Sequence, residues 1–331
     1  MKAFVVREPG SAEVLDWPAP TPNSGEVLVR PLLAGMCGTD LELIDGSIDP
    51  AYVRYPLVLG HEWVGQLVSD ADGEVGGATV VVEGVVPCGE CSGCQRGDTN
   101  LCETYDEIGF TRPGAIAELI SVPAFLVHRL DPTVSLEDAV LVEPMAVVWR
   151  ALTRFSLREG LRVAIVGDGT IALLAAHLVR LFSPSHVSVV GRREEQRALA
   201  LEAGADEFLT VTPDDRFDLV IEAAGNAASV ESALALCARG AMVILLGLPP
   251  HGTRVEIAPD DLVNDDIVIQ ASFSYTRRSF AEVVERLNVH ELEPSFLITH
   301  RFNLDDAPSA LAALVGTPHA EPRGKVTVAI S

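Results

Sequence analysis

Four of the six cysteines stand close together in the chain, at Cys88, Cys91, Cys94 and Cys102. Glycine and proline are frequent around them, so the segment is expected to be a loop that can bend its thiols toward one point. Four thiolates in this spacing can surround a tetrahedral zinc ion and leave no coordination position open. The motif therefore predicts a structural zinc site rather than a catalytic one. The alternative, two disulfides or cysteines with no shared role, is disfavoured by such tight spacing in a reducing compartment.

A second set of metal-ligand residues comes earlier, in Cys37-Gly-Thr-Asp and Gly60-His61-Glu62. A single cysteine is more often a small buried apolar residue, and a single histidine more often belongs to a core, so neither motif is decisive alone. Together, upstream of a nucleotide-binding pattern, they indicate an open zinc site. Glu143 is the candidate third ligand, because Cys37, His61 and Glu143 with one water leave the exchangeable position that catalysis needs. Glu62 is expected either to alternate as a ligand or to orient its neighbour.

A third motif stands between a predicted strand and a predicted helix, as Gly167-Asp-Gly169-Thr170-Ile171-Ala172. In such a loop Gly167 allows the tight turn, Gly169 admits the pyrophosphate and Ala172 keeps the helix close to the strand. The first helical turn, with Thr170 and Ile171, then presents unpaired N–H groups to the phosphates. The motif predicts a dinucleotide cofactor.

The choice between the two nicotinamide dinucleotides is expected to depend on Gly191, Arg192 and Arg193. Folds that prefer NAD place Asp or Glu after the second strand, to bind the ribose 2′-hydroxyl. Glycine at this position removes the carboxylate and leaves space for a 2′-phosphate, which the two arginines can bind. The sequence therefore predicts NADP. In the alternative, the arginines pair with Glu194 and Glu195, and these carboxylates restore NAD binding.

The elements that must position these motifs follow two patterns. Up to about residue 140, short β-like runs broken by glycine and proline predict an irregular, mostly antiparallel domain. From about residue 136, apolar strands alternate with helices, which predicts a parallel sheet of the doubly wound dinucleotide-binding type. The expected strands are Lys2–Val6, Glu26–Leu33, Trp63–Ser69, Ala78–Val86, Ala117–Val122, Arg162–Val166, His186–Val190, Glu207–Val211, Phe217–Glu222, Ala241–Gly247, Ile267–Phe273 and Gly324–Ile330. The expected helices are Leu136–Arg154, Thr170–Phe182, Glu194–Ala203, Ser229–Arg239 and Phe280–Arg286.

These patterns predict an α/β protein in which the dinucleotide-binding domain is inserted into the zinc-binding one. We expect the zinc-binding domain at residues 1–146, the inserted domain at 147–289, and a return to the first domain at 290–331. The formal net charge of −23 repels phosphate backbones, which argues against binding of nucleic acid or anionic membranes. Neither a membrane span nor a signal-peptide core is expected, and clustered free cysteines favour the cytoplasm.

Together the three motifs resemble the zinc-dependent medium-chain dehydrogenase/reductase superfamily, which includes the alcohol dehydrogenases. The resemblance covers essentially the whole chain, to the closing Gly324-Lys325-Val326. It implies a GroES-like, mostly β catalytic domain with an inserted Rossmann domain, and two zinc ions per subunit, one catalytic and one structural. Glu143, followed by proline, resembles the third zinc ligand of the polyol, threonine and glucose dehydrogenase branch. Glu42 stands where many members carry histidine.

The resemblance implies an oxidoreductase that transfers hydride between NADP(H) and a secondary or hemiacetal hydroxyl of a sugar, polyol or cyclitol. Thr39 would be the first proton relay and Glu42 the next, unless Glu42 is a solvated surface carboxylate. The alternatives are a threonine-type amino-alcohol dehydrogenase and a non-catalytic binding protein, which the retained ligands disfavour. The apolar edge strand near residues 267–273 further predicts a homodimer or homotetramer, since family members pair such edges.

Overall fold

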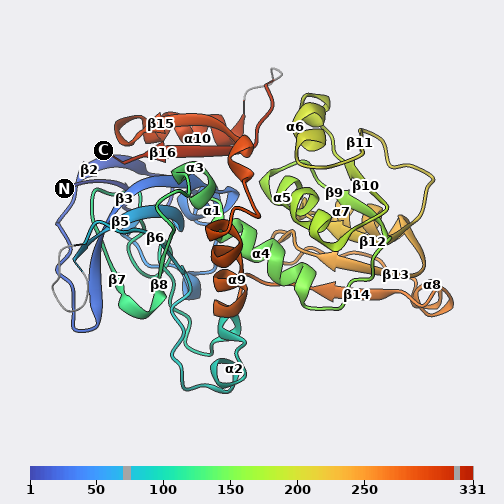
Figure 1. The fold of residues 1–331 in the computed structure, drawn as a ribbon, viewed down its shortest axis with the longest axis horizontal. Coiled ribbons are helices and arrows are strands. Elements are labelled where there is room, and N and C mark those ends of the chain that lie inside the picture. Colours follow the sequence, from blue (N-terminus) through green and yellow to red (C-terminus); the bar gives the residue numbers. More distant parts are fainter. Residues whose placement is uncertain (70–75, 317–320, 331) are drawn as a thin grey trace. The chain divides into compact units, whose positions relative to one another are not determined.

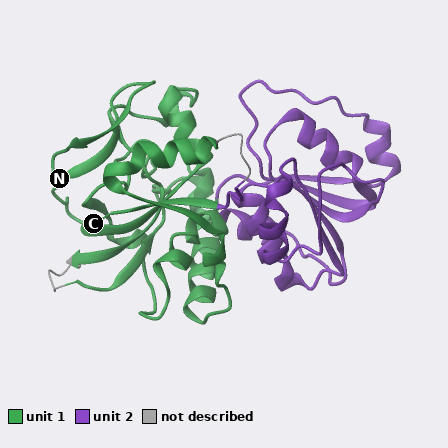
Figure 2. Cartoon of the chain, turned by 90° about the horizontal axis from the view of Figure 1, so that it is seen from above, with its two compact units in different colours: residues 1–146, 275–318, 325–331 green, residues 147–274, 319–324 purple. Residues whose placement is uncertain are grey.

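The computed structural model describes residues 1–69, 76–316 and 321–330, which form two compact units (Figure 2). The undescribed residues apart, unit 1 comprises Met1–Ala146, Tyr275–Pro318 and Lys325–Ser331, and unit 2 comprises Val147–Ser274 and His319–Gly324. The chain thus returns to unit 1 at Tyr275 instead of the expected residue 290. The cause is local, because the Tyr275 hydroxyl accepts the Gly84 N–H at 2.7 Å and Arg277 bonds Glu83 at 3.2 Å. Residues 321–324, expected in the C-terminal return, belong to unit 2.

Unit 1 is organised by a mixed sheet whose strands run in the order β15-β16-β3-β5-β6-β8, with β7 also paired to β3 (Figure 1). The long β3 is antiparallel to β16, β5 and β7, so it brings the C-terminal strand into the same sheet as strands from the first half of the chain. A smaller sheet has the order β2-β1-β4. The strands are β1 (Lys2–Val6), β2 (Ala12–Asp16), β3 (Glu26–Met36), β4 (Leu57–Val58), β5 (Glu62–Ser69), β6 (Thr79–Val82), β7 (Ile120–Pro123), β8 (Val127–Arg129), β15 (Ile298–Asn303) and β16 (Lys325–Ala329).

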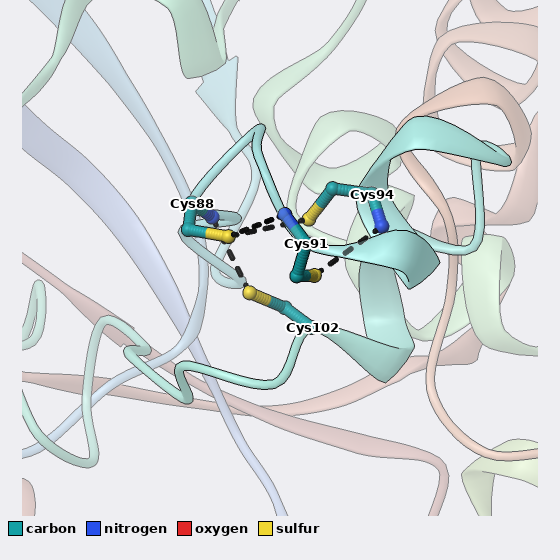
Figure 3. A group of neighbouring side chains, drawn as sticks. All are labelled: Cys88, Cys91, Cys94 and Cys102. Carbon is teal, nitrogen blue, oxygen red and sulfur yellow. Dashed lines mark hydrogen bonds between the residues drawn. The ribbon is translucent and has the colours of Figure 1, made fainter.

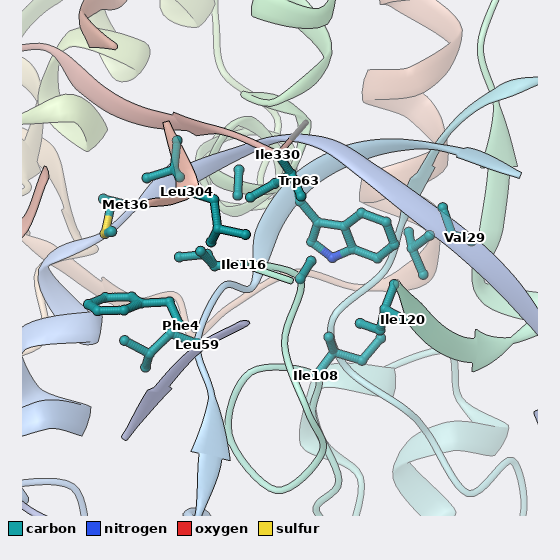
Figure 4. Packing of buried hydrophobic residues seen from close by; sticks show 14 of the residues in the cluster. Phe4, Val29, Met36, Leu59, Trp63, Ile108, Ile116, Ile120, Leu304 and Ile330 are labelled. Carbon is teal, nitrogen blue, oxygen red and sulfur yellow. The ribbon is translucent and has the colours of Figure 1, made fainter. Parts of the chain in front are cut away.

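The core of unit 1 gathers apolar side chains from segments that are far apart in the sequence (Figure 4). Trp63 is 3% exposed and lies among side chains of strands and loops, including Val29, Ile108 and Ile120. The helices are α1 (Gly38–Asp45), α2 (Ser92–Gln95), α3 (Leu136–Ala139), α9 (Arg277–Asn288), α10 (Ala307–Val315), and α4 (Val142–Thr153), which begins in unit 1 and continues in unit 2. The expected helix 136–154 is therefore two helices. No helix in the described parts of the chain is long and apolar enough to cross a membrane.

Unit 2 contains a parallel sheet with the strand order β11-β10-β9-β12-β13-β14. Counted within the unit this order is 3-2-1-4-5-6, that of the doubly wound dinucleotide-binding fold. Strands β9 and β10 pair in register from Arg162 and His186 to Val166 and Val190, so the loops after both strands start side by side. The strands are β9 (Arg162–Val166), β10 (His186–Val190), β11 (Glu207–Leu209), β12 (Phe217–Glu222), β13 (Cys237–Leu245) and β14 (Val268–Ala271); the helices are α5 (Thr170–Val179), α6 (Arg197–Glu202), α7 (Ala227–Ala235) and α8 (Pro259–Asn264).

The strands Lys2–Val6, Arg162–Val166, His186–Val190 and Phe217–Glu222 are confirmed residue for residue. The helix expected at 229–239 is wrong at its end, because α7 stops at Ala235 and β13 already begins at Cys237. Cys237 pairs with Phe217 across the sheet, and this pairing draws the chain out of the helix without an intervening loop. Cys237 is thus a half-buried strand residue and not the buried helical residue that the pattern predicted.

Candidate metal and cofactor sites

The four clustered cysteines converge as the sequence predicts. The sulfurs of Cys88, Cys91, Cys94 and Cys102 all lie within 4.8 Å of one another, and all four thiols are free (Figure 3). Backbone N–H groups point at them: Cys88 donates to the Cys102 sulfur at 3.3 Å, and Cys91 donates to the Cys88 sulfur at 3.4 Å. Hydrogen bonds led by the Cys94 N–H lower the pKa of Cys91 to about 6. Four converging sulfurs with N–H donors that favour thiolate fit a closed zinc site.

Cys37, His61 and Glu62 form the second group whose ligand atoms lie within 4.8 Å of one another. Cys37 is the residue before α1, where its N–H donates to the Asp40 carboxylate at 2.8 Å. His61 and Glu62 stand where β5 begins, and they are only 5% and 1% exposed. A thiol, an imidazole and a carboxylate are a donor set that zinc binds.

The buried side chain of Asp40 lies next to this group, close to the imidazole of His61. The Asp40 Oδ1 and His61 Nδ1 atoms are 3.8 Å apart, and both are buried without a hydrogen-bond partner. Burial lowers the pKa of His61, but the Cys37 thiol and the Asp40 charge outweigh burial and raise it well above its usual value. A buried imidazole with acidic groups on several sides fits a site built for a cation.

Glu62 is paired with a lysine from the far end of the chain. The Lys325 ammonium binds the Glu62 carboxylate and also donates to the Met36 carbonyl at 3.2 Å. Space for this carboxylate depends on Gly35, since a Cβ there would lie 2.5 Å from the Glu62 Oε2 atom. The Glu62 carboxylate is therefore close to the Lys325 ammonium as well as to the ligand atoms of Cys37 and His61, which suits an alternating or orienting role.

Glu143 is in the first turn of α4, outside the tightest ligand group but within electrostatic reach of it. Burial raises the pKa of Glu143 to about 8, the charges of Glu62 and Glu107 act in the same direction, and His61 opposes them.

Glu107 is a further carboxylate that the sequence analysis missed. Its Oε2 accepts the Tyr105 hydroxyl, and burial raises its pKa while the charge of His61 lowers it.

The two predicted proton-relay residues lie on α1. The Thr39 hydroxyl is 3.7 Å from the Cys37 sulfur, which places it beside the metal-ligand group. Glu42, three residues later and so on the same helix face, is half-buried, and burial raises the pKa of its carboxyl. The structure thus brings Thr39 to the group, while Glu42 has no described bond to Thr39.

The dinucleotide loop has the geometry that its sequence predicts. Gly167 has a φ of 134°, and a Cβ there would lie 3.1 Å from the Ala223 carbonyl carbon. Gly169 precedes α5, and a Cβ on it would meet no atom within 4 Å, which leaves room in front of the helix N-terminus. Ala172 is fully buried, and Thr170 donates its hydroxyl to the Gly324 carbonyl at 3.0 Å. Ile171 is half-buried in the same turn.

The structure corrects one expectation for Gly191, namely that its missing side chain leaves open space. A Cβ at Gly191 would lie 2.6 Å from the Asp168 Cβ and 2.7 Å from the Phe208 ring, so the space on this side of Gly191 is already filled. Asp168 accepts the N–H groups of Arg192 and Arg193 at 2.8 and 3.0 Å. The Arg193 guanidinium adds two bonds to its other oxygen, at 3.1 and 2.8 Å. Asp168 thus replaces Glu194 and Glu195 as the partner of Arg193.

Glu194 instead pairs with Arg197 at 2.5 Å. The residues that sequence reasoning missed are Asp40, Glu107, Asp168 and Lys325. Asp40 and Asp168 stand inside the recognised motifs, where an acidic residue beside metal ligands or arginines is itself a signal. Glu62 and Lys325 are far apart in the sequence, and no local motif indicates that they pair.

Comparison with known proteins agrees with this geometry. The model of the alcohol dehydrogenase GroES-like domain matches residues 23–132, and that of zinc-binding dehydrogenases matches residues 169–288. Sorbitol dehydrogenase of Bacillus subtilis is 29% identical, over 94% of this chain and 92% of its own length. L-threonine 3-dehydrogenase of Aeromonas hydrophila is 28% identical, over 90% of this chain and 91% of its own.

Known structures are similar over the whole fold. A zinc-binding dehydrogenase of Sinorhizobium meliloti 1021 bound to NADP has a TM-score of 0.91 and 29% identity, with 99% of this chain and 98% of the other covered. The short chain alcohol dehydrogenase of Escherichia coli CFT073 complexed with NADH has a TM-score of 0.90 and 26% identity, with 99% of each chain covered. Fold and metal-ligand groups together define a zinc-dependent oxidoreductase that acts on alcohols. The chain belongs to the zinc-type medium-chain alcohol dehydrogenase family.

Proposed function

We propose that this dehydrogenase transfers hydride between NADP(H) and a secondary or hemiacetal hydroxyl of a sugar, polyol or cyclitol. The observation that carries the proposal is the set of carboxylates around His61. Glu62 is within 4.8 Å of it, and the charges of Glu107 and Glu143 affect the same site. Carboxylates accept hydrogen bonds from neighbouring hydroxyl groups, which suits a polyhydroxylated substrate. The similarity to a sorbitol dehydrogenase supports the same class.

Cys37, His61 and Glu143 would hold the catalytic zinc, with Glu62 as an alternating ligand or an orienting group. When bound, zinc supplies Lewis-acid polarisation of a substrate oxygen. Thr39 Oγ1 would accept the proton of the substrate hydroxyl and pass its own proton on, and Glu42 would take it toward solvent. Cys88, Cys91, Cys94 and Cys102 would hold a structural zinc, giving two ions per subunit.

NADP is the proposed cofactor because the Asp168 carboxylate, beside Arg192 and Arg193, already accepts its full number of hydrogen bonds. Each oxygen of Asp168 accepts two hydrogen bonds, so this carboxylate cannot serve as the acceptor that a ribose 2′-hydroxyl requires.

We further propose a homodimer or homotetramer that pairs the β14 edge, where Val268 and Ile269 are 45% and 38% exposed. Six free cysteines support a reducing compartment such as the cytoplasm.

An amino-alcohol dehydrogenase is the second candidate, because the same carboxylates would attract an ammonium group. A substrate panel separates the two: zinc-replete protein and NADP⁺ with sorbitol, glucose, myo-inositol and L-threonine. We expect the highest kcat/KM with a polyol, sugar or cyclitol, at least tenfold above L-threonine. A preference for L-threonine would establish the amino-alcohol alternative. Absence of turnover with every member would support a non-catalytic binding protein.

A further inference from the structure

Arg193 alone is poorly placed to bind a 2′-phosphate. Its Nε and Nη2 atoms both donate to the Asp168 carboxylate, and Nη2 also donates to the Asp168 carbonyl at 2.9 Å. These bonds to Asp168 use Nε and Nη2 and leave Nη1 as the guanidinium nitrogen that does not bind Asp168. The Asp168 carboxylate also cancels one of the positive charges available to a 2′-phosphate, which carries about −1.5 to −2 at neutral pH. Even with Arg192 counted, a further cation is needed to balance that phosphate.

The C-terminal segment brings a third arginine to this place. Gln196 is fully buried, and its side-chain amide holds the Arg323 backbone from both sides. It accepts the Arg323 N–H at 2.6 Å and donates to the Arg323 carbonyl at 2.9 Å. The same amide nitrogen donates to the Asp168 carbonyl at 2.6 Å. One buried side chain therefore ties residue 323 to the dinucleotide loop.

The Arg323 guanidinium lies within the same electrostatic cluster. Burial lowers the pKa of Arg323, and the like charge of Arg193 lowers it further, while Asp168 and Glu195 act in the opposite direction. Gln196 fixes the Arg323 backbone beside Asp168, and Asp168 binds Arg193, so two like charges are kept within electrostatic reach of each other. An anion that contacts both arginines would relieve their repulsion. This arrangement is typical of a site for a dianion.

We infer that Arg323 is a cofactor-specificity residue, which binds the 2′-phosphate of NADP together with Arg192 and Arg193. The inference rests on the proposed preference for NADP. With the carboxylates of Asp168 and Glu195 counted, three arginines leave one net positive charge before the phosphate binds. Gln196 is the positioning residue, because it fixes Arg323 relative to Asp168.

Adenosine fragments isolate the contribution of the 2′-phosphate. Isothermal titration calorimetry would compare 2′,5′-ADP with 5′-AMP on the zinc-replete full chain. The variants are Arg323→Gln, Arg323→Lys and, as a matched control, Arg239→Gln, which removes an exposed arginine of the same unit that pairs with Asp265. In Arg323→Gln we expect the affinity for 2′,5′-ADP to fall about tenfold, or about 1.4 kcal/mol, with 5′-AMP unchanged. Arg323→Lys should be intermediate because it keeps the charge without the bidentate geometry, and Arg239→Gln should match the wild type.

The outcomes separate this inference from the proposed function. If wild-type protein binds the two fragments equally, the NADP preference fails and the inference fails with it. If the wild type prefers 2′,5′-ADP and Arg323→Gln keeps that preference, the role of Arg323 is rejected while the NADP preference stands. Equal weakening of both fragments would assign Arg323 a purely structural role and would also reject the inference.

Discussion

The ammonium of Lys325 binds the carboxylate of Glu62 at a place where each side chain is only 2% exposed. The two residues come from β16 and β5, which both pair with β3. Burial lowers the pKa of Lys325, but the charges of Glu62, Cys37 and Glu143 outweigh burial and raise it, so this ammonium stays charged at neutral pH. A buried pair of this kind adds little net stability, yet removal of one partner leaves an uncompensated charge.

Lys325→Met is therefore expected to lower the free energy of unfolding by about 3–5 kcal/mol. Urea denaturation followed by circular dichroism would measure it, with and without zinc. Lys2→Met is the matched control, because Lys2 pairs with Asp305 at 2.7 Å where the side chains are 50% and 68% exposed, and its loss should change little. The double variant Glu62→Gln with Lys325→Met should recover part of the loss. A single Lys325→Met variant as stable as the control would contradict the expectation.

Gly35→Ala should displace Glu62 and so weaken zinc binding at the predicted catalytic site about 10–100-fold, without affecting the four-cysteine site. The added Cβ would lie 2.5 Å from the Glu62 Oε2 atom, and this carboxylate cannot move freely because Lys325 holds it. Zinc content by inductively coupled plasma mass spectrometry should fall from about two ions toward about one per chain. Gly38→Ala is the control, since a Cβ there meets nothing within 4 Å. Two retained zinc ions in Gly35→Ala would refute this account of the site.

The convergence of the four cysteines and the shape of the glycine loop could be predicted because these motifs are local in the sequence. Four cysteines on one loop, or glycines between a strand and a helix, need only short-range spacing to be recognised. The strands β9, β10 and β12 were predicted to the residue, since buried parallel strands are continuous apolar runs with clear ends.

The contacts that set the charge and position of the site residues form between segments far apart in the sequence. Local spacing therefore does not reveal them. Glu62 and Lys325 are 263 positions apart, and Gln196 and Arg323 are 127 apart. The expectation of open space beside Gly191 was wrong for a related reason: Phe208 of β11 fills it, and only the sheet order brings that ring there. Likewise, α7 ends early because the next residues pair with β12.

Thiol reactivity should distinguish the cysteines in zinc-free protein. Backbone N–H bonds lower the pKa of Cys91 to about 6, so at pH 7.5 it is largely thiolate. Burial raises the pKa of Cys237 to about 11, so this thiol stays protonated until strongly alkaline pH. With iodoacetamide and peptide mass spectrometry, we expect Cys91 to be modified at least tenfold faster at pH 7.5. Zinc should protect Cys91 and leave the slow rate of Cys237 unchanged; fast labelling of Cys237 at neutral pH would overturn this ranking.

Gly169 and Gly191 should respond in opposite ways to the same substitution. In Gly191→Ala the new Cβ meets Asp168 at 2.6 Å and Phe208 at 2.7 Å, so cofactor-free protein should lose about 1–3 kcal/mol of stability. In Gly169→Ala nothing lies within 4 Å, so the stability should change by less than about 1 kcal/mol. That Cβ would instead obstruct the approach of a pyrophosphate to the start of α5, and NADPH affinity should fall at least tenfold. Thermal unfolding without cofactor and fluorescence titration with NADPH measure the two effects separately. A stable Gly191→Ala variant, or a Gly169→Ala variant that binds NADPH normally, would show that the two glycines do not have these separate roles.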